Sequence, residues 1–159
     1  MTRKEQYNQL ILQIAGLIRD ETNLVGILSN VSAALHDTFP ERFFWVGFYL
    51  QENGNMLRLG PFQGSVACYV IPFGKGVCGK AWEEERTLIV PDVEKFPGHI
   101  ACSSLSRSEI VVPMYDDSHT FRGVLDIDST RLNDFNEDDR EGLERIIELL
   151  MEETQDLFQ

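Results

Sequence analysis

The sequence predicts an α+β domain in which helices pack on an antiparallel sheet. Two amphipathic segments open the chain, several short apolar segments fill its middle, and a long amphipathic segment closes it. Turn residues connect most of the central segments, and strands joined by hairpins run antiparallel. The 159 residues have the usual length of one domain, so we expect residues 1–159 to form a single unit.

Three segments are predicted to be the main helices. Apolar residues recur at helical spacing over residues 5–18 and again on one face after Leu24. Thr22 or Asn23 is the expected cap of the second helix. Asn136 is the expected N-cap of the C-terminal helix, whose first turn is acidic and therefore complements the helix dipole.

Six strands are expected between these helices. Residues 43–50 are aromatic and β-branched, and a turn at 53–55 returns the chain as a second strand over 56–59. Residues 61–64 are expected to break the chain before a third strand over 67–71. The other strands are expected at 87–90, 109–114 and 121–127, and a short helix follows the glycine-rich loop at 74–79.

Composition excludes several classes of partner. The net charge is −12 and the 14 basic residues are scattered, so the field of the protein opposes binding to nucleic acid or to anionic membranes. No apolar run approaches the ~20 residues of a membrane span, and the charged N-terminus does not resemble a signal peptide. We therefore expect a reducing, cytoplasmic location. The acidity itself is explained by solubility or by attraction of a cationic group.

The three cysteines indicate thiol–disulfide chemistry. Their odd number and irregular spacing argue against a secreted disulfide scaffold, and a domain of this size folds without one. Structural cysteines usually lie inside apolar runs. Cys102 instead lies in a polar, loop-like segment, with Cys68 and Cys78 as thiols that could fold back to meet it.

Three acids stand where a sheet usually carries apolar or neutral groups. Asp126 and Asp128 alternate on one strand, so both side chains share a face with Val124. Three interpretations are open: the face is exposed to solvent, the acids cap the following turn, or they form a pocket for a metal or an ammonium group. Glu109 opens another apolar strand. It is either solvated at the strand edge or directed to the same site as Cys102.

Aromatic residues and a glycine offer a second candidate feature. Trp45, Gly47 and Tyr49 share one face of their strand. Such a strand is usually core, but a glycine between two aromatic residues leaves a hollow that could seat an apolar ligand group.

Two motifs in the chain resemble binding sites but lack the context that such sites need. The string Gly74-x-Gly76-x-x-Gly79 matches a dinucleotide fingerprint, but no βαβ unit surrounds it. The spacing His99-x-x-Cys102 is typical of zinc ligands, but no Cys-x-x-Cys knuckle accompanies it, so no metal is expected. The residues weighed for that zinc site are Cys68, Cys78, His99 and Cys102.

Five motifs occur in order along the chain: GPFQG at 60–64, GKGVCG at 74–79, PGHIAC at 97–102, SRSEIVVP at 106–113 and GVLDIDS at 123–129. Together with Ala67 and Cys68 they resemble the free methionine-(R)-sulfoxide reductase family, a catalytic branch of the GAF domains. The resemblance runs from about Trp45 to Phe135. It implies a GAF fold, with a six-stranded antiparallel sheet flanked by helices.

The resemblance also implies an activity: reduction of free methionine (R)-sulfoxide, with thioredoxin as the final reductant and no cofactor. It makes Cys102 the nucleophile, Cys68 the main resolving thiol and Cys78 a possible second one. The substrate pocket would be lined by Glu109, Asp126 and Asp128, with Trp45 facing the substrate methyl group. Ser103 departs from the family, which often has an aspartate after the nucleophile.

Two other functions are compatible with the pattern. One is a non-catalytic GAF sensor for a small ligand such as a cyclic nucleotide, although an acidic pocket would repel a phosphate and the chain leaves no room for an output domain. The other is an interaction module whose terminal helices pair between subunits. Such pairing is also compatible with a reductase that forms a homodimer.

Overall fold

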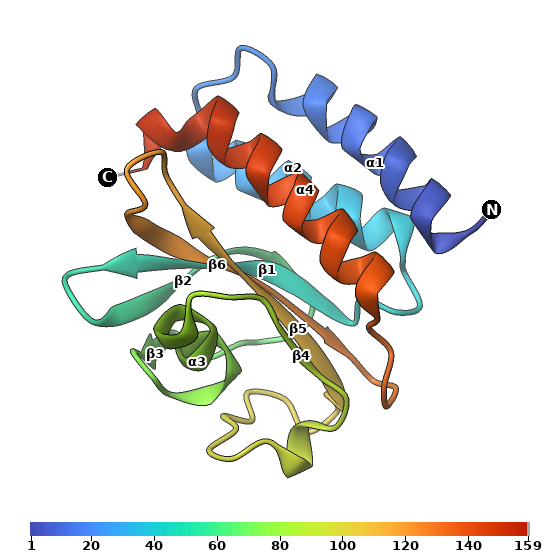
Figure 1. Cartoon of the computed structure of the whole chain (residues 1–159), viewed down its shortest axis with the longest axis vertical. Helices are drawn as coiled ribbons and strands as arrows, with labels where there is room; N and C mark the ends of the chain where they lie inside the picture. The colour runs from blue at the N-terminus through green and yellow to red at the C-terminus, as the bar shows by residue number, and fades with distance from the viewer. Residues whose placement is uncertain (159) are drawn as a thin grey trace.

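A single six-stranded antiparallel sheet organises the protein. The computed structural model describes residues 1–158, and the strands lie in the order β3-β2-β1-β6-β5-β4 (Figure 1). The predicted α+β class and the number of strands are confirmed. The strands are β1 Trp45–Glu52, β2 Met56–Gln63, β3 Val70–Pro72, β4 Leu88–Val90, β5 Ser108–Tyr115 and β6 Phe121–Ser129.

The helices cover the two faces of the sheet unequally. The long helices α1 (Arg3–Ile18), α2 (Leu24–Thr38) and α4 (Glu137–Thr154) lie on one face, and the short α3 (Gly76–Glu84) lies on the other (Figure 1). The Asn23 side chain caps α2 by accepting from the Gly26 N–H. Asn136 and Asp139 form a capping box at the start of α4. Single 3₁₀ turns occupy Val93–Lys95 and Gln155–Leu157.

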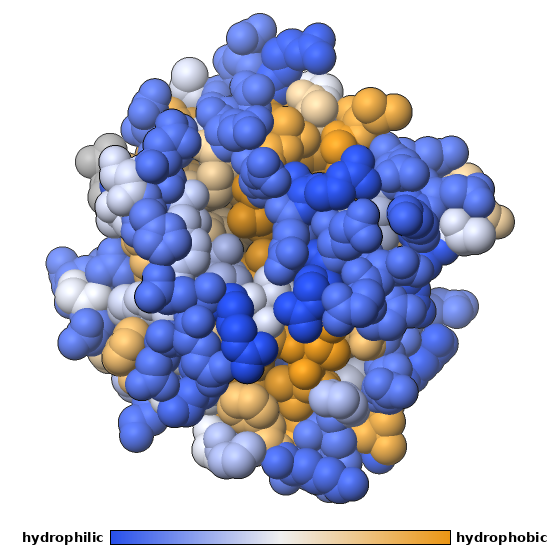
Figure 2. Space-filling view, in the orientation of Figure 1, coloured by the Kyte–Doolittle hydropathy of each residue, from blue (hydrophilic) through white to orange (hydrophobic). Residues whose placement is uncertain are grey.

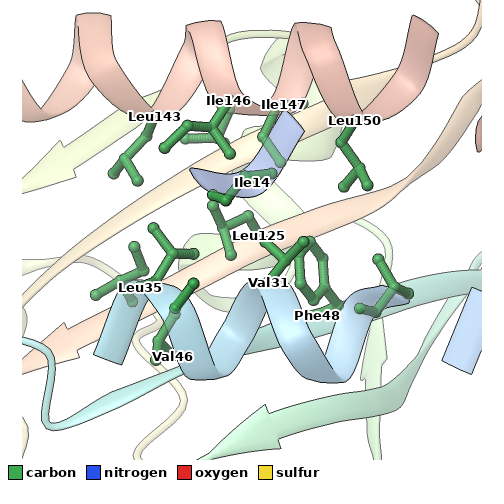
Figure 3. Close-up of a cluster of buried hydrophobic side chains, with 14 of the residues drawn as sticks. Ile14, Val31, Leu35, Val46, Phe48, Leu125, Leu143, Ile146, Ile147 and Leu150 are labelled. Atoms are coloured by element: carbon green, nitrogen blue, oxygen red, sulfur yellow. The ribbon is translucent and has the colours of Figure 1, made fainter. Parts of the chain in front are cut away.

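The main core fills the space between the three long helices and the sheet. Strand alternation directs Val46, Phe48 and Leu125 toward these helices, where each is fully buried (Figure 3). The helices contribute aliphatic side chains from their inner faces: Ile14, Val31, Leu35, Leu143, Ile146, Ile147 and Leu150. Because these strand residues face the helices, their sequence neighbours must face the other side of the sheet, where α3 and its loops lie.

Hydrophilic side chains dominate the face of the molecule shown in Figure 2, and apolar side chains appear mainly in its recesses. This distribution agrees with the net charge of −12. Among the helices of residues 1–158, none combines the length and the apolar character needed to cross a bilayer.

Two predicted boundaries were wrong, and both errors affect the site. Strand β2 continues through Pro61 to Gln63. Its backbone hydrogen bonds on the β3 side end at Leu59, so the rest of the strand has a free edge on that side. A free edge tolerates proline, which has no N–H to donate. The β1–β2 register also shifts between Gly47 and Tyr49. Strand β3 begins only at Val70, so Cys68 lies in a loop and not in a strand.

Candidate active site

The three unusual acids meet on the face of the sheet opposite the long helices. In the ladder, Asp128 pairs with Trp45 on one side and with Glu109 on the other. Asp126 occupies the next row on the same face. Directly paired residues carry their side chains side by side, so three central strands deliver one indole and three carboxyl groups to a single patch. We call Glu109, Asp126 and Asp128 the acid cluster.

The acid cluster is largely removed from water. Glu109 is 5% exposed and Asp126 is 6% exposed, whereas Asp128 is partly exposed. Burial and the charge of Asp128 raise the pKa of Glu109 to about 8. Burial and the neighbouring Glu109 raise the pKa of Asp126, and burial and Asp126 raise that of Asp128. The interpretation of Glu109 as a solvated edge residue is therefore wrong, because β5 lies inside the sheet between β4 and β6.

The acid cluster forms part of a pocket that supplies little positive charge. Among the described residues that line this pocket there is no lysine or arginine. His99 is the one basic side chain among the described lining residues, and its Nε2 lies 3.5 Å from a Glu109 carboxylate oxygen. Burial lowers the pKa of His99, although Asp126 opposes that change. In addition, Asp126 Oδ1 is buried without a hydrogen-bond partner within residues 1–158. The pocket is therefore electrostatically unbalanced and favours a cationic guest.

Two of the three cysteines are joined at this pocket. Cys68 and Cys102 form a disulfide with their Cα atoms 5.5 Å apart. Cys102 is exposed and lines the pocket, whereas Cys68, on the 64–69 loop, is partly exposed. The expectation that another cysteine folds back to meet Cys102 in its loop is confirmed by this pairing.

Cys78 has a different environment. It lies in the first turn of α3, is 3% exposed and remains a free thiol that lines the same pocket. Burial and the acid cluster raise the pKa of this thiol well above its usual value. At neutral pH the side chain is therefore a neutral thiol and a poor nucleophile.

Trp45 and Tyr49 form an aromatic wall of the pocket and also support the cysteine loop. Their rings stack with centroids 5.8 Å apart. Trp45 Nε1 donates to the Ser65 carbonyl at 3.0 Å, and the Tyr49 hydroxyl donates to the Cys68 carbonyl at 3.1 Å. Both residues therefore position the backbone that carries Cys68, a function that local sequence does not reveal.

The expected hollow at Gly47 does not exist. A Cβ atom on Gly47 would lie 2.3 Å from the Phe62 Cβ atom, because β2 approaches β1 closely at the register shift. The Phe62 ring also stacks on Trp45, with centroids 5.1 Å apart. Gly47 is therefore needed for strand packing, and the pocket lies beside the two aromatic rings, not between them.

Loops close the pocket above the sheet. Gly76 has φ = 61°, and a Cβ atom there would lie 3.1 Å from the Ile100 side chain, so a glycine lets the loop before Cys102 pack on α3. Ser103 Oγ accepts a hydrogen bond from the Leu105 N–H at 3.2 Å. An aspartate in this position could accept the same bond, which explains why this departure from the family pattern fits the loop.

Comparison with known proteins agrees with the geometry. The GAF domain family matches residues 21–151. A GAF domain-containing protein A from Dictyostelium discoideum is 56% identical over 94% of this chain and 92% of its own length. A free methionine-R-sulfoxide reductase from Saccharomyces cerevisiae is 43% identical over 94% of this chain and 86% of its own. The crystal structure of free methionine-R-sulfoxide reductase from Neisseria meningitidis with its substrate superimposes with a TM-score of 0.93, at 45% identity over 98% and 92% of the two chains.

The chain belongs to the free methionine-R-sulfoxide reductase family of GAF domains. In this member, the pocket is lined by seven of the eight residues that the sequence predicts for the site: Cys102, Cys78, Trp45, Tyr49, Glu109, Asp126 and Asp128. The eighth, Cys68, is joined to Cys102 by the disulfide. His99 and Ser106 also line the pocket, and no role in this activity is predicted for them. Their placement within the reductase motifs is the only local signal that marks them.

Proposed function

We propose that this chain reduces free methionine (R)-sulfoxide to methionine, using Cys102 as the nucleophile and Cys68 as the resolving thiol. The observation that carries the proposal is the placement of the Cys68–Cys102 disulfide beside a pocket with three acids and no lysine or arginine among its described lining residues. Membership of the reductase family supports the same activity.

The acid cluster explains why the substrate would be the free amino acid. The α-ammonium of free methionine sulfoxide supplies a positive charge to carboxyl groups that otherwise lack one. The unpartnered Asp126 Oδ1 offers an acceptor for it. A methionine sulfoxide inside a peptide has no α-ammonium, so its binding would leave these acids unpaired. The substrate methyl group would pack against the indole of Trp45.

The first chemical step consumes one thiol. The Cys102 thiolate attacks the sulfoxide sulfur, and the oxygen is transferred to Cys102 as methionine leaves, which produces a cysteine sulfenic acid. Attack requires a proton on the sulfoxide oxygen. Glu109, with its pKa raised to about 8, is protonated at neutral pH and can act as this acid. Cys102 lines the pocket, whereas Cys68 is not among the described lining residues, which supports Cys102 as the attacking group.

The second step forms the disulfide. The Cys68 thiol condenses with the Cys102 sulfenic acid and releases water, so one sulfoxide and two thiols give methionine, one disulfide and one water. A dithiol of the thioredoxin class would then reduce the exposed disulfide by exchange. Such a cycle requires a reducing compartment such as the cytoplasm. We assign Cys78 no obligatory redox step, because it is buried and its thiol is neutral.

The alternative of a non-catalytic sensor is less favoured. The acid cluster would repel the phosphate of a cyclic nucleotide, and a ligand sensor has no need of a disulfide at its pocket. Pairing of the terminal helices in a homodimer remains compatible with the reductase and would leave the chemistry of the pocket unchanged.

Two cysteine variants test the proposal. In the presence of thioredoxin, thioredoxin reductase and NADPH, wild-type protein should consume NADPH with free methionine (R)-sulfoxide but not with the S epimer. Without reductant, Cys68→Ser should release one methionine per chain and then stop, and Cys102→Ser should release none. Release of methionine by Cys102→Ser would overturn the assignment of the nucleophile, and full turnover by Cys68→Ser would overturn that of the resolving thiol.

A further inference from the structure

Three buried side chains of the pocket form a group that the reductase chemistry does not explain as a set. The thiol of Cys78 and the carboxylates of Glu109 and Asp126 each offer a ligand atom, and these atoms all lie within 4.8 Å of one another. They come from α3, β5 and β6, so three separate elements converge on this point. All three side chains are at least 94% buried. This arrangement differs from the four-residue zinc site weighed from the sequence, which used Cys68 and Cys102.

We propose that Cys78, Glu109 and Asp126 bind a divalent transition metal such as Zn²⁺, and that the bound metal excludes substrate from the pocket. Zinc is bound by thiolate and carboxylate ligands at about 2.0–2.3 Å. In a tetrahedral site these bond lengths place ligand atoms about 3.3–3.8 Å apart. Because the donor atoms lie within 4.8 Å of one another, they need to approach by about 1.5 Å at most. The fourth position faces the pocket and would hold water.

A second observation points to a ligand independently of the acidity. Asp126 Oδ1 is buried with no hydrogen-bond partner in the described part of the chain, on a side chain that lines the pocket. A buried carboxylate oxygen without a partner is costly, and a metal bond satisfies it directly. The Glu109 carboxylate already has an outer partner, since His99 Nε2 lies 3.5 Å from it. Partners of this kind commonly orient metal ligands.

The nature of the donors determines which cation fits. A thiol is a soft ligand that selects zinc or a similar transition metal over Mg²⁺ and Ca²⁺, which prefer oxygen. A dication also neutralises more of the acid cluster than a single ammonium group does. Because Glu109 and Asp126 are the groups that we assign to the substrate, metal and substrate cannot occupy the pocket together.

The oxidised protein allows a clean test. With Cys68 and Cys102 joined, Cys78 is the one free thiol of the chain's three cysteines. Addition of CoCl₂ to oxidised wild-type protein should produce the near-ultraviolet thiolate-to-cobalt charge-transfer band at one equivalent, and ZnCl₂ should bleach it. Cys78→Ser should abolish the band, and Glu109→Gln should weaken Co²⁺ binding at least tenfold. Glu148→Gln removes one exposed acid from α4 and is the matched control, for which no change is expected.

This readout does not require turnover, so it separates the metal site from the proposed reductase activity. If wild-type oxidised protein shows no thiolate–cobalt band, the proposal is wrong. A band that persists in Cys78→Ser would overturn it as well. Should Cys78→Ser fail to fold, an unchanged affinity for Co²⁺ in Glu109→Gln would also overturn it. In the reduced enzyme, Zn²⁺ should raise the KM for free methionine sulfoxide without lowering kcat at saturating substrate.

Discussion

Two groups of carboxylates lie in the interior of this molecule, and they differ in whether basic residues neutralise them. At the junction of α1 and α4, Asp139 is fully buried and contacts Arg3 at 2.7 Å, Arg42 at 3.0 Å and the Tyr7 hydroxyl at 2.6 Å. We call this group, together with Asp134, the paired cluster. In the acid cluster on the other side of the sheet, Glu109, Asp126 and Asp128 have only His99 as a basic neighbour among the described pocket residues.

The difference separates a structural role from a functional one. In the paired cluster every charge has a partner within the fold, and Arg42 also lies over the rings of Phe39, Phe43 and Phe135 at 5.1–5.6 Å. Among the side-chain polar atoms of these four charged groups in residues 1–158, Arg42 Nη1 is the one that is buried without a hydrogen-bond partner. In the acid cluster, burial and then the charges of neighbouring acids raise the pKa values of all three members. Its balance requires protons or a cation from solution, which is the property expected of a binding site.

Removal of a partner from the paired cluster should have the largest effect on stability. Arg42→Met leaves Asp139 buried with one arginine fewer, and loss of one partner of a buried ion pair costs about 3–5 kcal/mol. Chemical denaturation measures this loss. Arg131→Met is the control, because Arg131 pairs with Glu41 at 3.7 Å on the surface, and such pairs contribute about 0–1 kcal/mol. Equal losses in the two variants would show that the paired cluster does not stabilise the fold.

Neutralisation of an acid in the acid cluster should lower activity without lowering stability. Asp126→Asn should lower kcat/KM by about ten- to a hundred-fold, because it removes a charge-assisted hydrogen bond of roughly 1.5–3 kcal/mol to the ammonium group. The free energy of unfolding of the ligand-free protein should stay the same or rise, since asparagine cannot carry the charge that burial and Glu109 disfavour at this position. Asp156→Asn, which changes an exposed acid, should alter neither quantity. A marked loss of stability in Asp126→Asn would show that Asp126 stabilises the fold, as the residues of the paired cluster do.

The acid cluster should also set how stability depends on pH. For an acid whose pKa is higher in the folded state, the folded protein holds the proton to higher pH, so stability falls as pH rises. For Glu109 this window runs from its unfolded value of about 4.5 to about 8. Each proton involved contributes a slope of about 1.4 kcal/mol per pH unit. Urea denaturation between these pH values should therefore show a smaller decline for Glu109→Gln than for wild type. Identical slopes would mean that Glu109 ionises normally in the fold.

The smallest effect is expected at the rim of the pocket. Ser103→Asp restores the residue common in the family and adds a fourth carboxylate near the acid cluster, but it keeps the acceptor for the Leu105 N–H. Because Ser103 lies on a partly exposed loop, stability should change by no more than about 0.5 kcal/mol. Steady-state kinetics should show little change in kcat/KM. A large change would show that the imbalance of charge extends beyond the three buried acids.

Local pattern was enough to predict the acid cluster but not its surroundings. Alternation alone places Asp126 and Asp128 on one face, and capping signals located α2 and α4. Whether Glu109 stands at an edge depends on the order of the strands, and that order depends on the pairing of β1 with β6 from opposite ends of the domain. No local signal carries that information.

The other features that the sequence did not predict also depend on contacts between distant elements. The contact between Phe62 and Gly47 arises from a register shift between two strands, and the strand limits near Cys68 follow from where β3 stops pairing. The paired cluster joins Arg42 to Asp139, which are 97 positions apart, and no local pattern links the two residues. Spacing within a motif finds residues of one element, whereas contacts between elements require the fold.

Above all, we propose that the uncompensated acids bind the α-ammonium of a free amino acid. The most direct measurement compares turnover of free methionine (R)-sulfoxide with that of its N-acetylated form at equal concentration, with thioredoxin as the reductant. N-acetylation removes the positive charge and leaves the sulfoxide intact. Wild type should reduce the free compound efficiently and the N-acetylated compound poorly, and Asp126→Asn should narrow the difference. Equal rates on the two compounds with wild-type protein would contradict the claim.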